Sequence, residues 1–237
     1  FEQYKDVYLT AALNLNYDDL EVQSTASDSL KKQAGTFTDL AFDYGIRLDT
    51  RDKAYMPTSG SIASFAQTIP LYADTPYLRN KFTLSKYNAF GEDVVGSFKF
   101  YLASINGLQG EDVRLSKRAK MPSTRLRGFK PAKIGPKDGT DYVGGNYAAA
   151  INLETNLPNL FPESTKTDVG LFLDFGNLWG VDYDSSVDES NKIRSSVGIN
   201  TSWLSPIGPM SFVLSQNLSK ADTDETQSFT FNLGTSF

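Results

Sequence analysis

Apolar and polar residues alternate along most of this chain with a period of two. In the first such run every odd position from Val7 to Tyr17 is apolar, whereas the even positions include Thr10, Asn14 and Asn16. Successive side chains of a β-strand point to opposite faces, so each run predicts a strand with one apolar face. About ten such runs are present, at residues 7–17, 39–49, 63–69, 78–90, 97–103, 146–157, 169–179, 193–203, 210–218 and 228–237.

The face opposite the apolar one is small or polar in most of these runs. In the second run Asp43 and Arg47 alternate with Phe42, Tyr44 and Ile46. A soluble β-sandwich turns its apolar faces inward, whereas a transmembrane barrel turns them toward lipid and keeps a polar lumen. Alternation alone does not say which face lies inside.

The connections between the runs separate these two classes. Counted back from the C-terminus, they alternate between long and short. The long ones are residues 219–227, 180–192 and 107–145, and the short ones are residues 205–209, 158–166 and 91–93. Outer-membrane barrels have short periplasmic turns and long external loops. No helix is recognisable, and Trp and Tyr lie near strand ends. We therefore predict an all-β fold, an antiparallel transmembrane β-barrel, rather than a soluble β domain.

The composition removes several classes of active site. The sequence has 237 residues, a net charge of −5, no Cys and no His. A chain without Cys has no disulfide scaffold and no thiolate metal site. The lack of His excludes Ser-His and Cys-His catalytic arrangements and imidazole metal sites. We predict that the protein is not an enzyme and that it uses no cofactor and no metal.

The sequence also bears on membrane insertion and on processing. No stretch approaches the ~18–20 unbroken apolar residues of a membrane-spanning helix. The chain begins at Phe1 without a Met, so we interpret it as a mature segment or a fragment.

The longest connection, residues 107–145, is rich in basic side chains. They are Arg114, Lys117, Arg118, Lys120, Arg125, Arg127, Lys130, Lys133 and Lys137. A connection of this length without strands of its own is usually functional or disordered. A solvated basic loop and a functional loop are both compatible with its composition.

An ordered series of short motifs begins in this connection. The motifs are Leu126-Arg127-Gly128-Phe129, Ile134-Gly135-Pro136, Gly144-Gly145-Asn146, Phe172-Leu173-Asp174-Phe175-Gly176 with Trp179, Leu204-Ser205-Pro206-Ile207-Gly208-Pro209, and the ending Phe229 to Phe237. In this order they resemble the C-terminal barrel of the BamA family of outer-membrane protein assembly factors. The resemblance covers nearly the whole chain. Family barrels have about sixteen strands and follow POTRA domains, so the first strands and all POTRA domains are missing here.

The resemblance implies a function, a location and partners. The family folds nascent β-barrel proteins and inserts them into the bacterial outer membrane without a nucleotide. Residues 1–237 would be a single barrel domain, integral to the outer membrane, with a periplasmic C-terminus. Expected partners are nascent outer-membrane barrel proteins, outer-membrane lipids, and assembly-complex lipoproteins and periplasmic chaperones bound through the missing POTRA domains. No nucleic acid is expected.

The resemblance also implies a lumenal site. In the family the loop that carries Arg127 folds into the lumen, where its guanidinium meets acids at positions matching Glu154 and Asp174. Phe172 and Gly176 flank the second acid and complete the predicted acceptor set. The alternation independently places Glu154 and Asp174 on the polar face. Charges scattered in a watery lumen are the alternative interpretation.

A second predicted site is the seam strand at the C-terminus. Phe229, Phe231 and Leu233 give it an apolar stripe, and Gly234 matches a family glycine where a kink weakens seam pairing. The terminal Phe237 resembles the barrel's own recognition signal. An open strand edge presents unpaired backbone groups that can template an incoming strand.

Other functions stay open at this point. A passive pore is one alternative, although a long loop in the lumen argues against it. A protein translocator of the same superfamily, of the two-partner secretion type or of the translocation and assembly module, is another.

Overall fold

The computed structural model describes residues 6–182, 187, 191–206 and 208–234, and ten long strands in them form one antiparallel sheet. Each strand pairs with the next long strand along the chain. The strands are β1 (Val7–Leu20), β2 (Gly35–Asp49), β3 (Gly60–Ala73), β4 (Tyr77–Ala89), β5 (Val95–Gly107), β8 (Tyr147–Asn156), β9 (Thr167–Trp179), β10 (Arg194–Ser205), β11 (Gly208–Ser219) and β12 (Phe229–Leu233). This confirms the prediction of about ten antiparallel strands.

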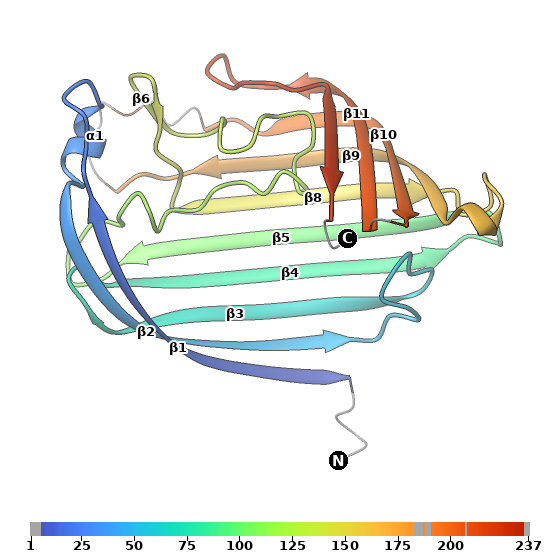
Figure 1. The fold of residues 1–237 in the computed structure, drawn as a ribbon, viewed down its shortest axis with the longest axis horizontal. Helices are drawn as coiled ribbons and strands as arrows, with labels where there is room; N and C mark the ends of the chain where they lie inside the picture. The colour runs from blue at the N-terminus through green and yellow to red at the C-terminus, as the bar shows by residue number, and fades with distance from the viewer. Residues whose placement is uncertain (1–5, 183–186, 188–190, 207, 235–237) are drawn as a thin grey trace.

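The sheet curves into a trough, and the connection between β5 and β8 lies inside the curve (Figure 1). That connection contains a small hairpin of β6 (Lys137–Asp138) and β7 (Asp141–Tyr142). The strands β1 and β12 are the two edges, and no pairing joins them within the described part of the chain. The sheet is therefore a curved wall around a filled interior, as in part of a barrel.

The two faces of this wall have the reverse polarity of a soluble sandwich. Large apolar side chains are exposed on the outer face, and examples are Leu9 at 76%, Leu171 at 53% and Ile199 at 47%. On the inner face Asp174 and Ser196 are fully buried. An outward apolar band around a polar interior is the arrangement of a membrane barrel.

Inside the trough, the long connection packs on the sheet through an apolar cluster. Its members are Tyr77, Tyr101, Ala103, Ile105, Val113, Ala119, Met121, Leu126, Phe129, Ile134, Ala148, Ala150 and Leu178. The cluster contains side chains from β4, β5, β8 and β9 together with side chains from the connection. Burial of this apolar surface holds the loop against the wall.

Several local predictions were wrong in detail. The strand expected to end at Ile69 continues to Ala73, because a bulge between Leu40 and Ala41 accommodates Pro70, which has no N–H to donate. The described residues include two short helices, α1 (Asp28–Lys31) and a 3-10 turn (Glu163–Thr165), and both are too short to give a periodic signal. Among the described residues, no helix is long and apolar enough to cross a membrane.

The alternation of long and short connections is also less regular than predicted. Only residues 74–76 join β3 to β4, although this turn lies at the same end as the long connections, at the left of Figure 1. The turn between β2 and β3 has ten residues, 50–59, and lies at the opposite end. The alternation of long and short connections therefore holds in the C-terminal half of the chain, where the sequence showed it.

Candidate functional site

The predicted lumenal motif, residues 126–129, makes a tight turn against the inner face of the sheet. Leu126 and Phe129 are buried at 1% and 5% exposure. Gly128 has φ of +89°, and a Cβ there would lie 3.1–3.3 Å from side-chain atoms of Ser215, Asn217 and Ser196. Both the backbone conformation and the space favour glycine. The turn directs Arg127 toward β8 and β9.

The Arg127 guanidinium forms a two-pronged ion pair with Asp174 on β9. Its Nε donates to Asp174 Oδ2 at 2.8 Å, and Nη2 donates to Oδ1 at 2.7 Å. The third nitrogen, Nη1, donates to Glu154 Oε2 on β8 at 3.4 Å. A planar guanidinium matches a carboxylate in this geometry, which a lysine does not reproduce. The structure thus brings together Arg127 and both predicted acids.

Further hydrogen bonds fix the Asp174 carboxylate and the loop backbone. Asp174 also accepts from the Arg127 backbone N–H at 3.0 Å and from Asn152 Nδ2 at 2.8 Å. Asn152 Nδ2 donates in addition to the Arg125 carbonyl at 2.8 Å. The Ser196 hydroxyl donates to the Arg127 carbonyl at 2.5 Å. The buried Asp174 carboxylate thus accepts hydrogen bonds from four donors. Removal of one donor leaves part of its charge unpaired in a low-dielectric interior, which costs free energy.

The remaining predicted acceptors complete the surroundings of Arg127. Its guanidinium carbon lies 3.6 Å from the ring centroid of Phe172, a cation–π arrangement. Glu154 makes a second ion pair with Lys99 at 3.2 Å. Gly176 lies under the loop, and a Cβ there would be 3.4 Å from Leu126 Cδ2. Each of these positions faces the interior because side chains along a β-strand point alternately to its two faces.

Four residues of this site were missed by the sequence analysis: Lys99, Asn152, Ser196 and Gly198. The alternation already placed them on the polar face, but it gave no reason to select them. Their selection depends on register, because Asp174 is opposite Asn152 on β8 and opposite Ser196 on β10. The signal that could have selected Asn152 and Ser196 is their place opposite the predicted acid on the neighbouring strands.

Gly198 makes room for the Phe172 ring, and we expect Gly198→Ala to destabilise the site. A Cβ at this position would lie 2.1 Å from the Leu214 carbonyl oxygen and 2.6 Å from Phe172 Cζ. Overpacking of this kind costs about 1–3 kcal/mol of unfolding free energy. Denaturant unfolding of the purified protein measures it. The control is Gly176→Ala, whose Cβ meets only ordinary contacts, and equal losses in the two variants would contradict the prediction.

The predicted seam residues lie at the free edge of the sheet. The side chains of Phe229, Phe231 and Leu233 are 53%, 45% and 53% exposed. Gly234 directly follows the described part of β12, has φ of +73°, and its N–H donates to the Pro209 carbonyl at 2.8 Å. A positive φ departs from the extended conformation and favours glycine at this position. Phe237 lies outside the described residues.

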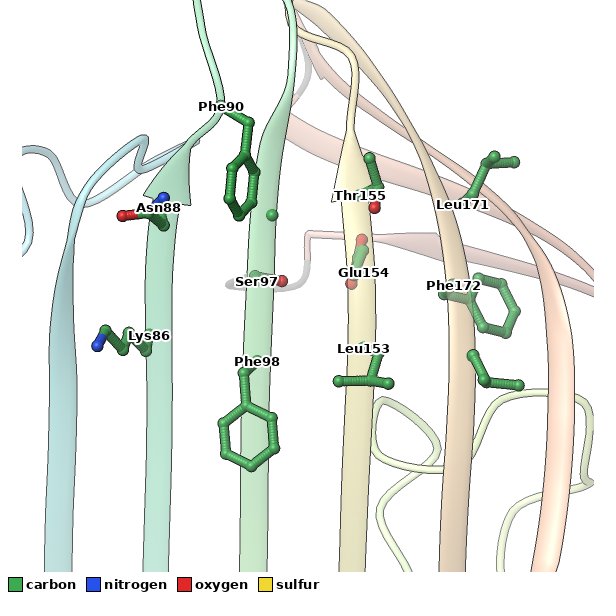
Figure 2. A pocket seen from close by; sticks show the side chains of 12 residues that line it. Lys86, Asn88, Phe90, Ser97, Phe98, Leu153, Glu154, Thr155, Leu171 and Phe172 are labelled. Carbon is green, nitrogen blue, oxygen red and sulfur yellow. The ribbon is translucent and has the colours of Figure 1, made fainter.

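A shallow hollow of about 520 Å³ lies on the sheet near the short-turn ends of β4, β5, β8 and β9. Figure 2 shows Phe90 and Phe98 beside β5, with Leu153 and Thr155 along β8. Alternation assigns Phe98 and Leu153 to the outer face, opposite to Glu154. Glu154 and Phe172, which contact Arg127, also line the hollow, but most of its lining residues belong to the outer face.

Comparisons with known proteins agree with this architecture. The family model of the Omp85 superfamily domain matches residues 1–237. The outer membrane protein assembly factor BamA of Neorickettsia risticii (strain Illinois) is 27% identical over 238 residues, covering 98% of this chain and 32% of the relative. The same factor from Neisseria meningitidis serogroup B is 32% identical over 139 residues, covering 47% of this chain and 17% of the relative.

One solved structure shares the fold over nearly the whole chain. The crystal structure of BamA from Haemophilus ducreyi lacking POTRA domains 1–3 superposes with a TM-score of 0.85 at 22% identity, covering 96% of this chain and 51% of that one. The chain thus spans a third or less of the length of these curated relatives, and about half of the crystallised one.

Proposed function

The chain belongs to the Omp85 superfamily, and on that premise we propose that it is the barrel portion of an assembly factor of the bacterial outer membrane. The proposed activity is folding and insertion of other β-barrel proteins, without a nucleotide. The observation that carries the proposal is the Arg127 site: a loop returns into the interior and is fixed there by a bidentate ion pair with Asp174. A barrel that serves only as an open channel does not require a loop that is fixed inside its interior.

The open edge at β12 supplies a physical route to insertion. In hydrocarbon each unsatisfied backbone group costs several kcal/mol, so an exposed strand edge is strongly driven to pair with another strand. We propose that β12 acts as this edge and that an incoming strand pairs with it by β-augmentation. The exposed Phe229, Phe231 and Leu233 would keep the edge anchored in lipid while it exchanges partners.

The orientation and partners belong to the same proposal. The end that carries the short turns, residues 90–94 and 157–166, would face the periplasm together with the C-terminus, because barrels place short turns there. The partners are nascent barrel proteins and outer-membrane lipids, with lipoproteins and periplasmic chaperones reached through POTRA domains elsewhere in the protein. Arg127 and Asp174 would position the loop during insertion, a role that involves no bond making or breaking.

Reconstitution of the full-length protein into lipid vesicles tests this function. A small transmembrane β-barrel protein, unfolded in urea, is diluted into the vesicles, and its folded fraction is followed by the heat-dependent shift of its gel mobility. We expect folding several times faster than in empty vesicles. Folding no faster than in empty vesicles would refute the proposal. Faster release of a secreted substrate instead would favour the translocator, and steady ion conductance alone would favour the pore.

A further inference from the structure

The turn that carries Arg127 also forms backbone hydrogen bonds with the residues that lead into β12. The Gln227 N–H donates to the Gly128 carbonyl at 3.0 Å, and the Lys130 N–H donates to the Glu225 carbonyl at 3.0 Å. An antiparallel bridge joins Phe129 to Thr226 between these bonds. Residues 225–227, which we name the edge segment, therefore have the loop as a strand partner.

One further backbone hydrogen bond and two exposed ion pairs add to this pairing. The Glu225 N–H donates to the Lys133 carbonyl at 3.0 Å. Its carboxylate lies 3.0 Å from Lys130 Nζ and 3.7 Å from Lys133 Nζ, and these side chains are 40–50% exposed. Exposed ion pairs contribute little. The pairing depends mainly on a few backbone hydrogen bonds and is reversible without disruption of the sheet.

The backbone of the edge segment bonds to the loop, whereas the backbone of β12 bonds to β11. Residues of an antiparallel strand direct their backbone groups alternately to the two sides. Ser215 donates to the Ser228 carbonyl at 2.8 Å, so Ser228, Thr230 and Asn232 face β11. Within β12 the alternate residues Phe229, Phe231 and Leu233 therefore face the open edge, and a bend at Ser228 separates them from Glu225 and Gln227, which bond to the loop.

The first open position of β12 is also covered. The Gln227 side chain donates from Nε2 to the Phe229 carbonyl at 2.7 Å. The Phe229 carbonyl is therefore engaged by a side chain of the edge segment as well.

We propose that the loop is an internal stand-in for an incoming strand, and that it must leave residues 225–227 before a client strand pairs along the full seam. Glu225 and Gln227 are the positioning residues, because one backbone N–H serves either the loop or a client strand. Gly128, which accepts from Gln227, directly follows Arg127. The Arg127–Asp174 pair therefore sets how readily the edge is uncovered. This inference rests on the proposed function.

A disulfide that holds the loop on the edge segment tests the proposal in the full-length protein. Lys130→Cys with Glu225→Cys is suitable: the sequence has no native Cys, and Cα atoms of hydrogen-bonded partners lie about 5.5 Å apart, within disulfide range. We expect the oxidised protein to insert a urea-unfolded barrel protein into vesicles about tenfold more slowly, with recovery on reduction. An unchanged rate after oxidation overturns the proposal.

The matched control joins two strands far from the seam. Ser64→Cys with Thr83→Cys places a disulfide between β3 and β4, where the two hydroxyl oxygens lie 2.6 Å apart. Its oxidation is expected to leave the insertion rate unchanged. A similar slowing in this control would assign the effect to general stiffening of the wall and overturn the proposal.

A second measurement does not depend on insertion activity. Amide hydrogen exchange at Glu225 and Gln227 is compared between the native protein and Arg127→Ala, with Ser215, which bonds within the sheet, as reference. We expect exchange at the two edge amides to accelerate about tenfold or more while Ser215 changes little. Unchanged exchange at the edge amides refutes the coupling. Accelerated exchange in a protein that inserts no client refutes the proposed function alone.

Discussion

Arg127→Ala is expected to reduce the insertion of client barrels by about tenfold or more, because it leaves the Asp174 carboxylate buried without its counter-charge. Asp174 is fully buried, and three of its four donors come from Arg127. Breaking a buried pair from one side costs about 3–5 kcal/mol, which corresponds to a factor of roughly 10² to 4 × 10³ in the docked population of the loop. Undocking also uncovers residues 225–227, but the unpaired Asp174 charge disrupts the wall itself, and we expect this damage to outweigh the gain from a free edge.

Two other variants make this prediction specific. Arg127→Lys keeps the positive charge and loses the two-pronged geometry, and an intermediate insertion rate is expected. Lys120→Ala removes an exposed basic residue from the same loop and should leave insertion unchanged. The vesicle assay measures all three variants at equal protein density. If the insertion rate with Lys120→Ala is as low as with Arg127→Ala, the overall positive charge of the loop explains the effect and the ion pair of Arg127 does not.

The largest expected effect on stability comes from a second buried ion pair. Arg194 donates from Nε and Nη2 to the two carboxylate oxygens of Asp224 at 2.8 and 2.9 Å, and both side chains are fully buried. Arg194 Nη1 donates to Asn177 Oδ1 at 2.8 Å, and the Ala221 N–H donates to Asp224 at 2.6 Å. The pair ties the start of β10 to the connection before β12.

Asp224→Ala is expected to lower the unfolding free energy by about 3–5 kcal/mol, since the Arg194 charge stays buried without its carboxylate. The double variant Arg194→Met with Asp224→Leu removes both charges, and its unfolding free energy should fall markedly less. Denaturant unfolding in a defined detergent compares them. Glu225→Ala is the neighbouring control, because this carboxylate forms only exposed ion pairs. A double variant that is less stable than the single one would contradict the argument from buried charge.

The lumenal site was predictable in its membership and not in its geometry. Strand alternation placed Glu154 and Asp174 on one polar face, and the family resemblance selected Arg127 as their partner. The partners Asn152 and Ser196 were not selected, because they become neighbours of Asp174 only through the register of three strands. Register depends on pairing between segments that are distant in the sequence, and a one-residue shift would exchange the two faces of a strand.

The sequence alone determined the strands and their two faces, because side-chain direction in a strand is a local property of the backbone with period two. The alternation predicted about ten strands and one long loop without alternation. Only the tertiary structure decided which face lies inside, that the loop fills the trough, and that residues 225–227 pair with the loop. These facts arise from curvature and from contacts between residues about a hundred positions apart, such as Gly128 and Gln227. No local pattern of apolar and polar residues records such contacts.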